Sequence, residues 1–167
     1  MSAPATILAP VRGLALLVLA VTALAAAACG GGGDGQLSKA DYEQQVGAIL
    51  RPVQETTLPN VLQISPDQAD QAVQQLKKAE TTLHDDAETL RTMKPPEDAT
   101  GPTTELAEGI GRIADQVTSI RKGAEAGDFN RLEQFKVQVA SDPAVAQIRA
   151  GITELINLGY DVAGNTP

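Results

Sequence analysis

Apolar residues recur every three or four positions in four stretches of this 167-residue chain, the spacing of one face of an α-helix. The first stretch opens at Ser38, and the acid Asp41 follows three residues later, as at a helix N-terminus. Its apolar face comprises Tyr42, Val46, Ile49, Leu50, Val53 and Thr57. We expect Pro52 to kink this helix or end its regular part, and Leu58-Pro59-Asn60 to close it.

The second stretch begins at Ser65-Pro66-Asp67-Gln68, which combines a serine cap, a proline in the first turn and a glutamine partner for the cap. One continuous stripe follows: Ala69, Ala72, Val73, Leu76, Ala79, Leu83, Ala87, Leu90 and Met93. Its three leucines are seven residues apart, as in the seam of a helical bundle. We expect this helix to end at Lys94-Pro95-Pro96, and the chain up to Pro102 to be a connection.

The third stretch opens near Thr103 or Thr104 and ends at Gly127-Asp128. Its apolar positions are Leu106, Ile110, Ile113, Val117, Ile120 and Ala124. The fourth carries Phe129, Leu132, Phe135 and Val139, then Val145, Ile148, Ile152, Leu155 and Ile156. A break is predicted at Asp142, because the residue before Pro143 avoids helical angles. With no strand-like alternation, the pattern predicts an all-α, up-and-down four-helix bundle whose last helix is broken at Asp142-Pro143.

The N-terminus has a different pattern, apolar from Gly13 to Ala28 with Arg12 as the charge before it. A positive region, an apolar region and small residues in this order are typical of an export signal. The apolar span from Gly13 to Ala28 is shorter than the roughly 20 residues of a transmembrane helix. We therefore predict cleavage of residues 1–28, with an uncleaved membrane anchor as the alternative.

The chain has a single cysteine, Cys29, and it directly follows three alanines. This arrangement resembles a bacterial lipobox, although Ala26 stands where lipoproteins usually carry leucine. The resemblance implies cleavage between Ala28 and Cys29 and a diacylglycerol on the Cys29 thiol, with its amino group open to a further acyl chain. The alternative is ordinary secretion, which would leave Cys29 as a free thiol prone to intermolecular pairing. In the lipidated protein, residues 29–36, rich in glycine, would serve as a tether between the lipid and the folded domain.

Composition and charge narrow the function further. Loss of residues 1–28 leaves 139 of the 167 residues, and residues 37–167 suffice for one domain. This mature chain keeps all 21 acidic residues and 12 of 13 basic ones, a net charge of −9. Such a balance argues against binding of nucleic acid or adsorption onto anionic lipid, so the anchor on Cys29 would provide the contact with the membrane.

Candidate chemistry centres on the one histidine, His84, which shares a helix face with Glu80 and Glu88. These three residues form either a weak metal site or pH-sensitive patch, or a solvated charged surface; the neighbouring apolar stripe favours the surface. A di-iron centre needs a Glu-x-x-His spacing, and position 81 is Thr81. We therefore expect neither a metal nor a cofactor.

Catalytic motifs are missing from the sequence. It has one histidine, no Gly-x-Ser-x-Gly elbow, and no lysine after the glycine run that could complete a phosphate loop. Tyr42 and Tyr160 either line a small apolar pocket or pack in the core. The glutamines of the first half form either a recognition face or neutral helix surface: Gln44, Gln45, Gln54, Gln63, Gln68, Gln71, Gln74 and Gln75.

Three stretches resemble small extracytoplasmic lipoproteins of actinobacterial (high-GC Gram-positive) type. LSKADYEQQVGAIL (37–50) is similar to their first helix, LRTMKPPED (90–98) to their double-proline hinge, and LGYDVAGN (158–165) to their end. The resemblance implies export and a helical fold, without an assigned activity. Leu50 and Ala163 stand where that family has two cysteines, and Gly47 where it has an asparagine. We hypothesise that Leu50 and Ala163 make an apolar contact that closes the C-terminus onto the first helix.

These observations predict a non-enzymatic lipoprotein on the outer face of the cytoplasmic membrane, anchored through Cys29. It would be a binding or accessory module for another protein of the cell envelope. The alternative is a carrier of a small apolar ligand, held in a cleft between helices. A cavity of a few hundred cubic ångströms would favour the carrier, and a filled core with an exposed apolar patch the partner-binding module.

Overall fold

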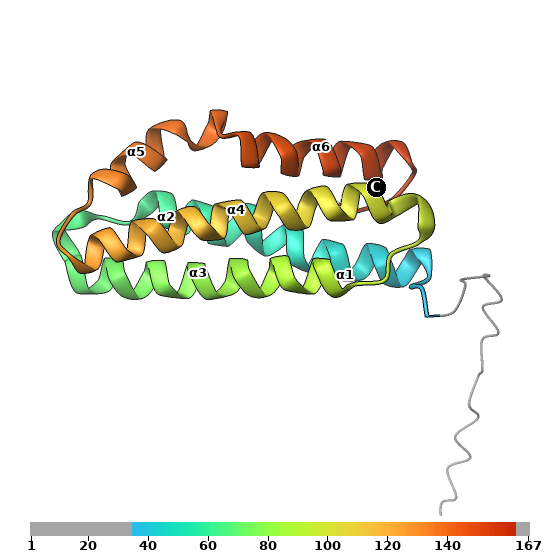
Figure 1. Cartoon of the computed structure of the whole chain (residues 1–167), viewed down its shortest axis with the longest axis horizontal. Helices are drawn as coiled ribbons and strands as arrows, with labels where there is room; N and C mark the ends of the chain where they lie inside the picture. The colour runs from blue at the N-terminus through green and yellow to red at the C-terminus, as the bar shows by residue number, and fades with distance from the viewer. Residues whose placement is uncertain (1–34, 163–167) are drawn as a thin grey trace, which may run out of the picture.

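The protein, described here from a computed structural model for residues 35–162, is an all-α bundle of four rods that run up and down (Figure 1). Its elements follow in the order α1 (Lys39–Pro52), η1 (Val53–Thr57), α2 (Leu58–Gln63), η2 (Pro66–Gln68), α3 (Ala69–Thr92), η3 (Glu97–Ala99), α4 (Thr100–Glu125), α5 (Asn130–Gln138), η4 (Val139–Ser141) and α6 (Pro143–Asn157). The first rod comprises α1, η1 and α2, and the last comprises α5, η4 and α6. The predicted bundle is confirmed.

The first rod is longer than the sequence predicted, because the chain stays helical beyond both Pro52 and Pro59. Pro52 ends the regular α-helix as expected, but the chain continues through the π-helical η1, where the Leu58 N–H donates to the Val53 carbonyl five residues back. Proline has no N–H, and a wider π-turn accommodates the interrupted ladder. The prediction that Leu58-Pro59-Asn60 closes the helix is wrong, since these residues open α2.

The second rod, α3, follows its predicted stripe closely. Ser65 caps η2, the short turn that leads into α3, by accepting a hydrogen bond from the Asp67 N–H at 3.4 Å. Six residues of the stripe are buried: Ala72, Leu76, Ala79, Leu83, Ala87 and Leu90. Ala69 is exposed in the first turn, and Val73 and Met93 are half-buried. The rod ends at Thr92, before the two prolines, as predicted.

The third rod begins earlier than predicted, at Thr100 rather than Thr103 or Thr104. Pro102 lies in its first turn, where a backbone N–H has no partner within the helix and its absence costs nothing. The prediction of a connection up to Pro102 is therefore wrong for its last three residues. Figure 1 shows α4 between α3 and α6, and its apolar residues are buried along its whole length.

Two glycines let α4 and α6 approach closely. A Cβ atom on Gly109 would lie 2.6 Å from the Ile148 side chain and 3.0 Å from the Ala144 carbonyl oxygen. A Cβ atom on Gly151 would lie 3.0 Å from the Pro102 carbonyl oxygen. Each glycine thus lacks a side chain at a point where the backbone of the other helix lies very close.

The last rod is broken at Asp142, as predicted. The Asp142 carboxylate accepts the Ala144 N–H at 2.8 Å and so caps α6, while Gln116 of α4 donates to its other oxygen at 2.9 Å. At the far end Gly159 takes a positive φ of 83°. The Tyr160 N–H then returns to the Leu155 carbonyl at 2.9 Å, which closes the helix with a glycine turn.

Candidate functional site

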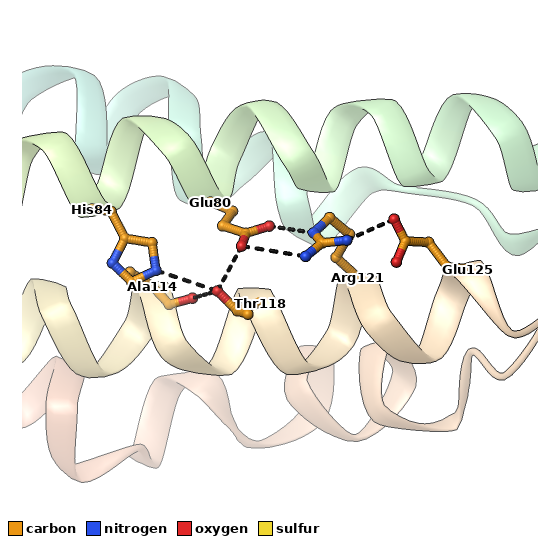
Figure 2. Close-up of polar contacts among 6 residues, drawn as sticks. All are labelled: Glu80, His84, Ala114, Thr118, Arg121 and Glu125. Atoms are coloured by element: carbon orange, nitrogen blue, oxygen red, sulfur yellow. Dashed lines mark hydrogen bonds and ion pairs between the residues drawn. The ribbon is translucent and has the colours of Figure 1, made fainter.

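His84 and Glu80 point from α3 toward α4, where they meet Thr118 and Arg121 (Figure 2). His84 Nε2 lies 3.3 Å from Thr118 Oγ1, and that hydroxyl lies 3.0 Å from both Glu80 Oε1 and the Ala114 carbonyl oxygen. Thr118 has one proton to donate, and these two oxygens compete for it. Its contact with His84 is therefore a hydrogen bond when Nε2 carries the proton.

Arg121 completes this α3–α4 network by bridging two glutamates. Its Nε and Nη2 donate to Glu80, and its Nη1 donates to Glu125 at 2.6 Å. The side chains of Arg121 and Glu80 are only 16% and 18% exposed, so the pair is partly shielded from water. The Arg121 guanidinium holds the pKa of Glu80 below its usual value. This pair therefore joins two helices through charge-assisted hydrogen bonds.

The predicted trio of Glu80, His84 and Glu88 does not converge. Glu88 is exposed and pairs with Arg91 of its own helix at 3.5 Å. Within residues 35–162, no group of three histidine, cysteine or acidic side chains could hold a metal ion. The prediction of a solvated face is right for Glu88 and wrong for Glu80 and His84. Their partners lie 34 to 41 residues away in the sequence, beyond the reach of helical spacing.

A second polar cluster, the tyrosine clasp, joins the two ends of the domain and consists of Tyr42, Tyr160, Thr103 and Asp98. The tyrosine rings meet edge to face with centroids 5.2 Å apart. Thr103 donates to the Ala99 carbonyl, so the Tyr42 hydroxyl donates to Thr103 Oγ1 at 2.6 Å. The Tyr160 hydroxyl donates to Asp98 Oδ1, also at 2.6 Å.

Burial raises the pKa of the Tyr42 hydroxyl. Burial and the hydrogen bond to Asp98 raise the pKa of Tyr160 as well. Both hydroxyls therefore stay protonated and act as donors. Of the two alternatives from the sequence, the structure favours packing in the core over a pocket, because Tyr42 and Tyr160 both belong to the buried apolar cluster.

The end of the described chain folds back onto α1 beside this clasp. The Asp161 N–H donates to Glu43 Oε1 at 3.0 Å, and the Val162 carbonyl oxygen lies 3.8 Å from the position of a Cβ atom on Gly47. Leu50 and Val162 are buried. Ala163 lies outside the described residues, so its contact with Leu50 stays a prediction.

The hollows between the helices are lined by mixed or polar side chains. One of about 260 Å³ between α4 and α5 is lined by the buried Ile120 and Phe135 beside Gln116 and Arg131. Another of about 440 Å³ lies between the first rod and α3, and Ala79 is its one apolar lining residue. Of these two hollows, the one between α4 and α5 has more apolar lining residues, Ile120, Phe135 and Val139, beside its polar ones.

The eight predicted glutamines are all exposed, on the first rod and on α3 with its preceding turn. Gln63 and Gln75 both line the hollow between the first rod and α3. Large apolar side chains are exposed at Val137, Ile156 and Leu158, and Val137 reaches 83%. Val137 is on α5, while the other two are near the end of α6, so these side chains do not form one patch.

The predicted cleavage and lipidation residues, Ala28 and Cys29, lie outside the described residues. In the described part of the chain, no helix has the length and apolarity that a membrane crossing requires. Comparison with protein families, with curated proteins and with solved structures found no match for this chain.

Proposed function

We propose that this protein is a non-enzymatic lipoprotein, held by Cys29 at the outer face of the cytoplasmic membrane. Its bundle would act there as a binding or accessory module for another protein of the cell envelope. The observation that carries the proposal is the position of Cys29 after Ala26-Ala27-Ala28, close to the first residue joined to the bundle. Two acyl chains on one residue would anchor the domain far better than one.

The structure limits how far the bundle can stand from such an anchor. The Leu37 N–H donates to the Lys94 carbonyl at 2.8 Å, so the chain is attached to the bundle from Leu37 onward. Eight residue steps separate Cys29 from Leu37, and an extended chain covers at most about 28 Å over that length. The end of the bundle with the tyrosine clasp would therefore lie nearest the membrane.

A role in binding rather than catalysis is supported by the contacts of the titratable side chains, which bond to one another between elements. Glu80 and Arg121 join α3 to α4, and Asp98 and Tyr160 join the connection between α3 and α4 to the C-terminal end of the domain. These contacts keep the helices in place and leave those groups bonded to one another. A net charge of −9 for the mature chain would hold the bundle away from anionic lipid.

The intact mass of the protein extracted from membranes tests the anchor, with Cys29→Ala beside it. We expect a mass equal to residues 29–167 plus a diacylglyceryl group, and loss of this mass with release from the membrane in the variant. Crosslinking at the membrane would then identify the partner. An unmodified chain, or one that retains residues 1–28, would contradict the proposal.

A carrier of a small apolar ligand is the second candidate, because Ile120, Phe135 and Val139 line the hollow between α4 and α5. Its volume of about 260 Å³ is below the range of most ligand pockets. Titration with an apolar fluorescent probe would test this function, with Phe135→Ala as the variant and Phe129→Ala as the control. Equal binding to both variants, or none to the parent protein, would exclude this hollow.

A further inference from the structure

The hollow between the first rod and α3, called here the polar groove, has the features of a ligand site. Thr57 and Ala79 are buried at its floor. Its rim consists of Thr56, Asn60, Gln63, Gln75, Lys78 and Thr82. The volume of about 440 Å³ is within the range of small-molecule sites. The groove thus presents three hydroxyls, three amides and one ammonium, with no carboxylate.

The hydroxyl of Thr57, a residue of the π-helical turn η1, lies at the floor of the groove. Elsewhere in the bundle the hydroxyls of Thr89 and Thr103 bond to the carbonyl four residues back, at 2.8 Å and 2.6 Å. Thr57 is 9% exposed, and its hydroxyl makes no hydrogen bond within residues 35–162. It is not sealed from water, since the buried side-chain oxygens without a partner there belong to Asp86 and Gln147. This hydroxyl can therefore bond to water or to a ligand in the groove.

The other polar side chains of the groove are available as well. In the described domain, neither the three rim amides nor the hydroxyls of Thr56 and Thr82 bond to another part of the protein. An amide and a hydroxyl each offer both a donor and an acceptor. A ligand that matches them must itself carry several groups of both kinds, as a sugar does.

Lys78 gives the groove a preference for a negatively charged ligand. It is the only charged residue on the groove wall, and it stands on α3 one turn from both Gln75 and Thr82. An ammonium beside uncharged donors favours a ligand with one anionic group. With no aromatic ring in the lining, recognition would rest on hydrogen bonds rather than on stacking.

From these observations we propose that the polar groove binds a sugar acid, a hydroxyl-rich small molecule with one carboxylate. The carboxylate pairs with Lys78, and the hydroxyls bond to the amides of the rim and to Thr57 at the floor. Figure 1 shows that α2 lies toward the end of the bundle opposite the first turn of α1. The proposed site is therefore well separated from the tyrosine clasp.

Amide chemical shifts of the isotope-labelled protein, extracted in detergent, test this site. The probe is glucuronate, with glucose and acetate as matched ligands that lack the carboxylate or the hydroxyls. We expect saturable shifts at Thr57, Gln75 and Thr82 with glucuronate, and at least fivefold weaker binding of the other two. Titration to about 20 mM suffices, since a millimolar site would be mostly occupied there.

Four variants make the test specific. Lys78→Gln and Thr57→Val are expected to weaken glucuronate binding at least fivefold and threefold. Lys77→Gln and Thr81→Val change the same residue types on α3 outside the groove, and should leave binding unchanged. Lys78 is exposed, so its replacement leaves the fold intact even if the buried Thr57→Val variant fails to fold.

Each outcome decides the proposal. Shifts confined to the groove and lost in the two groove variants support it. The absence of saturable shifts overturns it, as do equal shifts with acetate, which would indicate simple ion pairing, or equal binding of glucose, which would leave Lys78 without its role. Every arm uses the same extracted protein, so the result is independent of how Cys29 is modified.

Discussion

Asp86, on α3, lies in surroundings that disfavour the ionised form of its carboxyl group. One of its carboxylate oxygens is buried without a hydrogen-bond partner in the described domain. Burial and the neighbouring charge of Asp85 raise its pKa from 3.8 to about 6. The folded state therefore holds the proton more tightly than the unfolded state does, and ionisation of Asp86 destabilises the fold.

We expect Asp86→Asn to stabilise the protein at neutral pH. The loss of folding stability caused by ionised Asp86 is absent below about pH 4, grows between pH 4 and 6, and is complete above pH 6. The gain at pH 7.5 should be about 1–2 kcal/mol, less than the two pKa units alone correspond to, because Asp86 is only half-buried. Urea unfolding at pH 7.5 and pH 4 measures it. The exposed control Asp115→Asn should change stability by less than about 0.5 kcal/mol at both pH values. A gain that persists at pH 4 would contradict this account.

Glu80 shows the opposite shift, and its contribution has the opposite pH dependence. Its pKa is lower in the folded state, so the pair with Arg121 stabilises the fold above about pH 4.5 and loses this effect as the pH falls through the lowered value. We expect Glu80→Gln to cost about 1–2 kcal/mol at pH 7, and progressively less as the pH falls below about 4.5. Thermal unfolding across this range measures the difference.

Glu125→Gln is the matched control, because Glu125 pairs with the same arginine but is 48% exposed. Exposed pairs contribute little, so a loss below about 0.5 kcal/mol is expected. Equal losses in the two variants would show that the partial burial of Glu80 has no energetic consequence.

At the scale of elements, the contact between α4 and α6 depends on Gly109 and Gly151. Alanine at position 109 would improve helix propensity by up to about 1 kcal/mol. Its Cβ atom, however, would lie 3.0 Å from the backbone oxygen of Ala144, which cannot move without shifting α6. The packing loss should prevail.

We therefore expect Gly109→Ala to destabilise the protein by about 1–3 kcal/mol, measured by urea unfolding. Gly101 offers a control in the same helix, since a Cβ atom there would have no atom of another element within 4 Å. Gly101→Ala should be neutral or stabilising by up to about 1 kcal/mol. A stabilised Gly109→Ala variant would show that the two helices are not closely packed there.

The first rod has a feature that helical periodicity alone does not predict, its continuation beyond Pro52. The rules for proline correctly ended α1 at Pro52, but they did not foresee that a π-turn would carry the rod on to Gln63. Burial of Val53, Thr57 and Val61 against the neighbouring helices outweighs the two missing N–H donors. Such a gain depends on partners that a local pattern does not contain.

At the scale of the whole molecule, the tyrosine clasp holds both ends of the domain together. Tyr160→Ala removes a buried ring and should cost about 2–4 kcal/mol. Hydrogen exchange should then quicken in residues 158–162 and in the first turn of α1. Tyr160→Phe keeps the ring and loses only the bond to Asp98, so a cost near 1 kcal/mol is expected. Unchanged exchange in Tyr160→Ala would show that the ends are held by other contacts.

The sequence by itself determined most helices of this protein, apart from the extent of the first rod and the start of α4. The apolar spacing of α3 and α4, the serine cap at Ser65 and the break at Asp142 depend on hydrogen bonds and periodicities within a few residues. Such local features can be read directly, and the four-rod bundle followed from them. The prediction of a lipid anchor at Cys29 has the same local basis.

Only the tertiary structure decided which residues meet. Glu80 and Arg121 are 41 residues apart, Tyr42 and Thr103 are 61 apart, and Asp161 and Glu43 are 118 apart. The polar groove likewise exists only where a π-turn faces α3. Helical spacing identifies which face of a helix is buried, but not which other helix packs against it, because the hydrophobic effect that drives this packing is non-directional. The shapes of all four rods together decide the pairing.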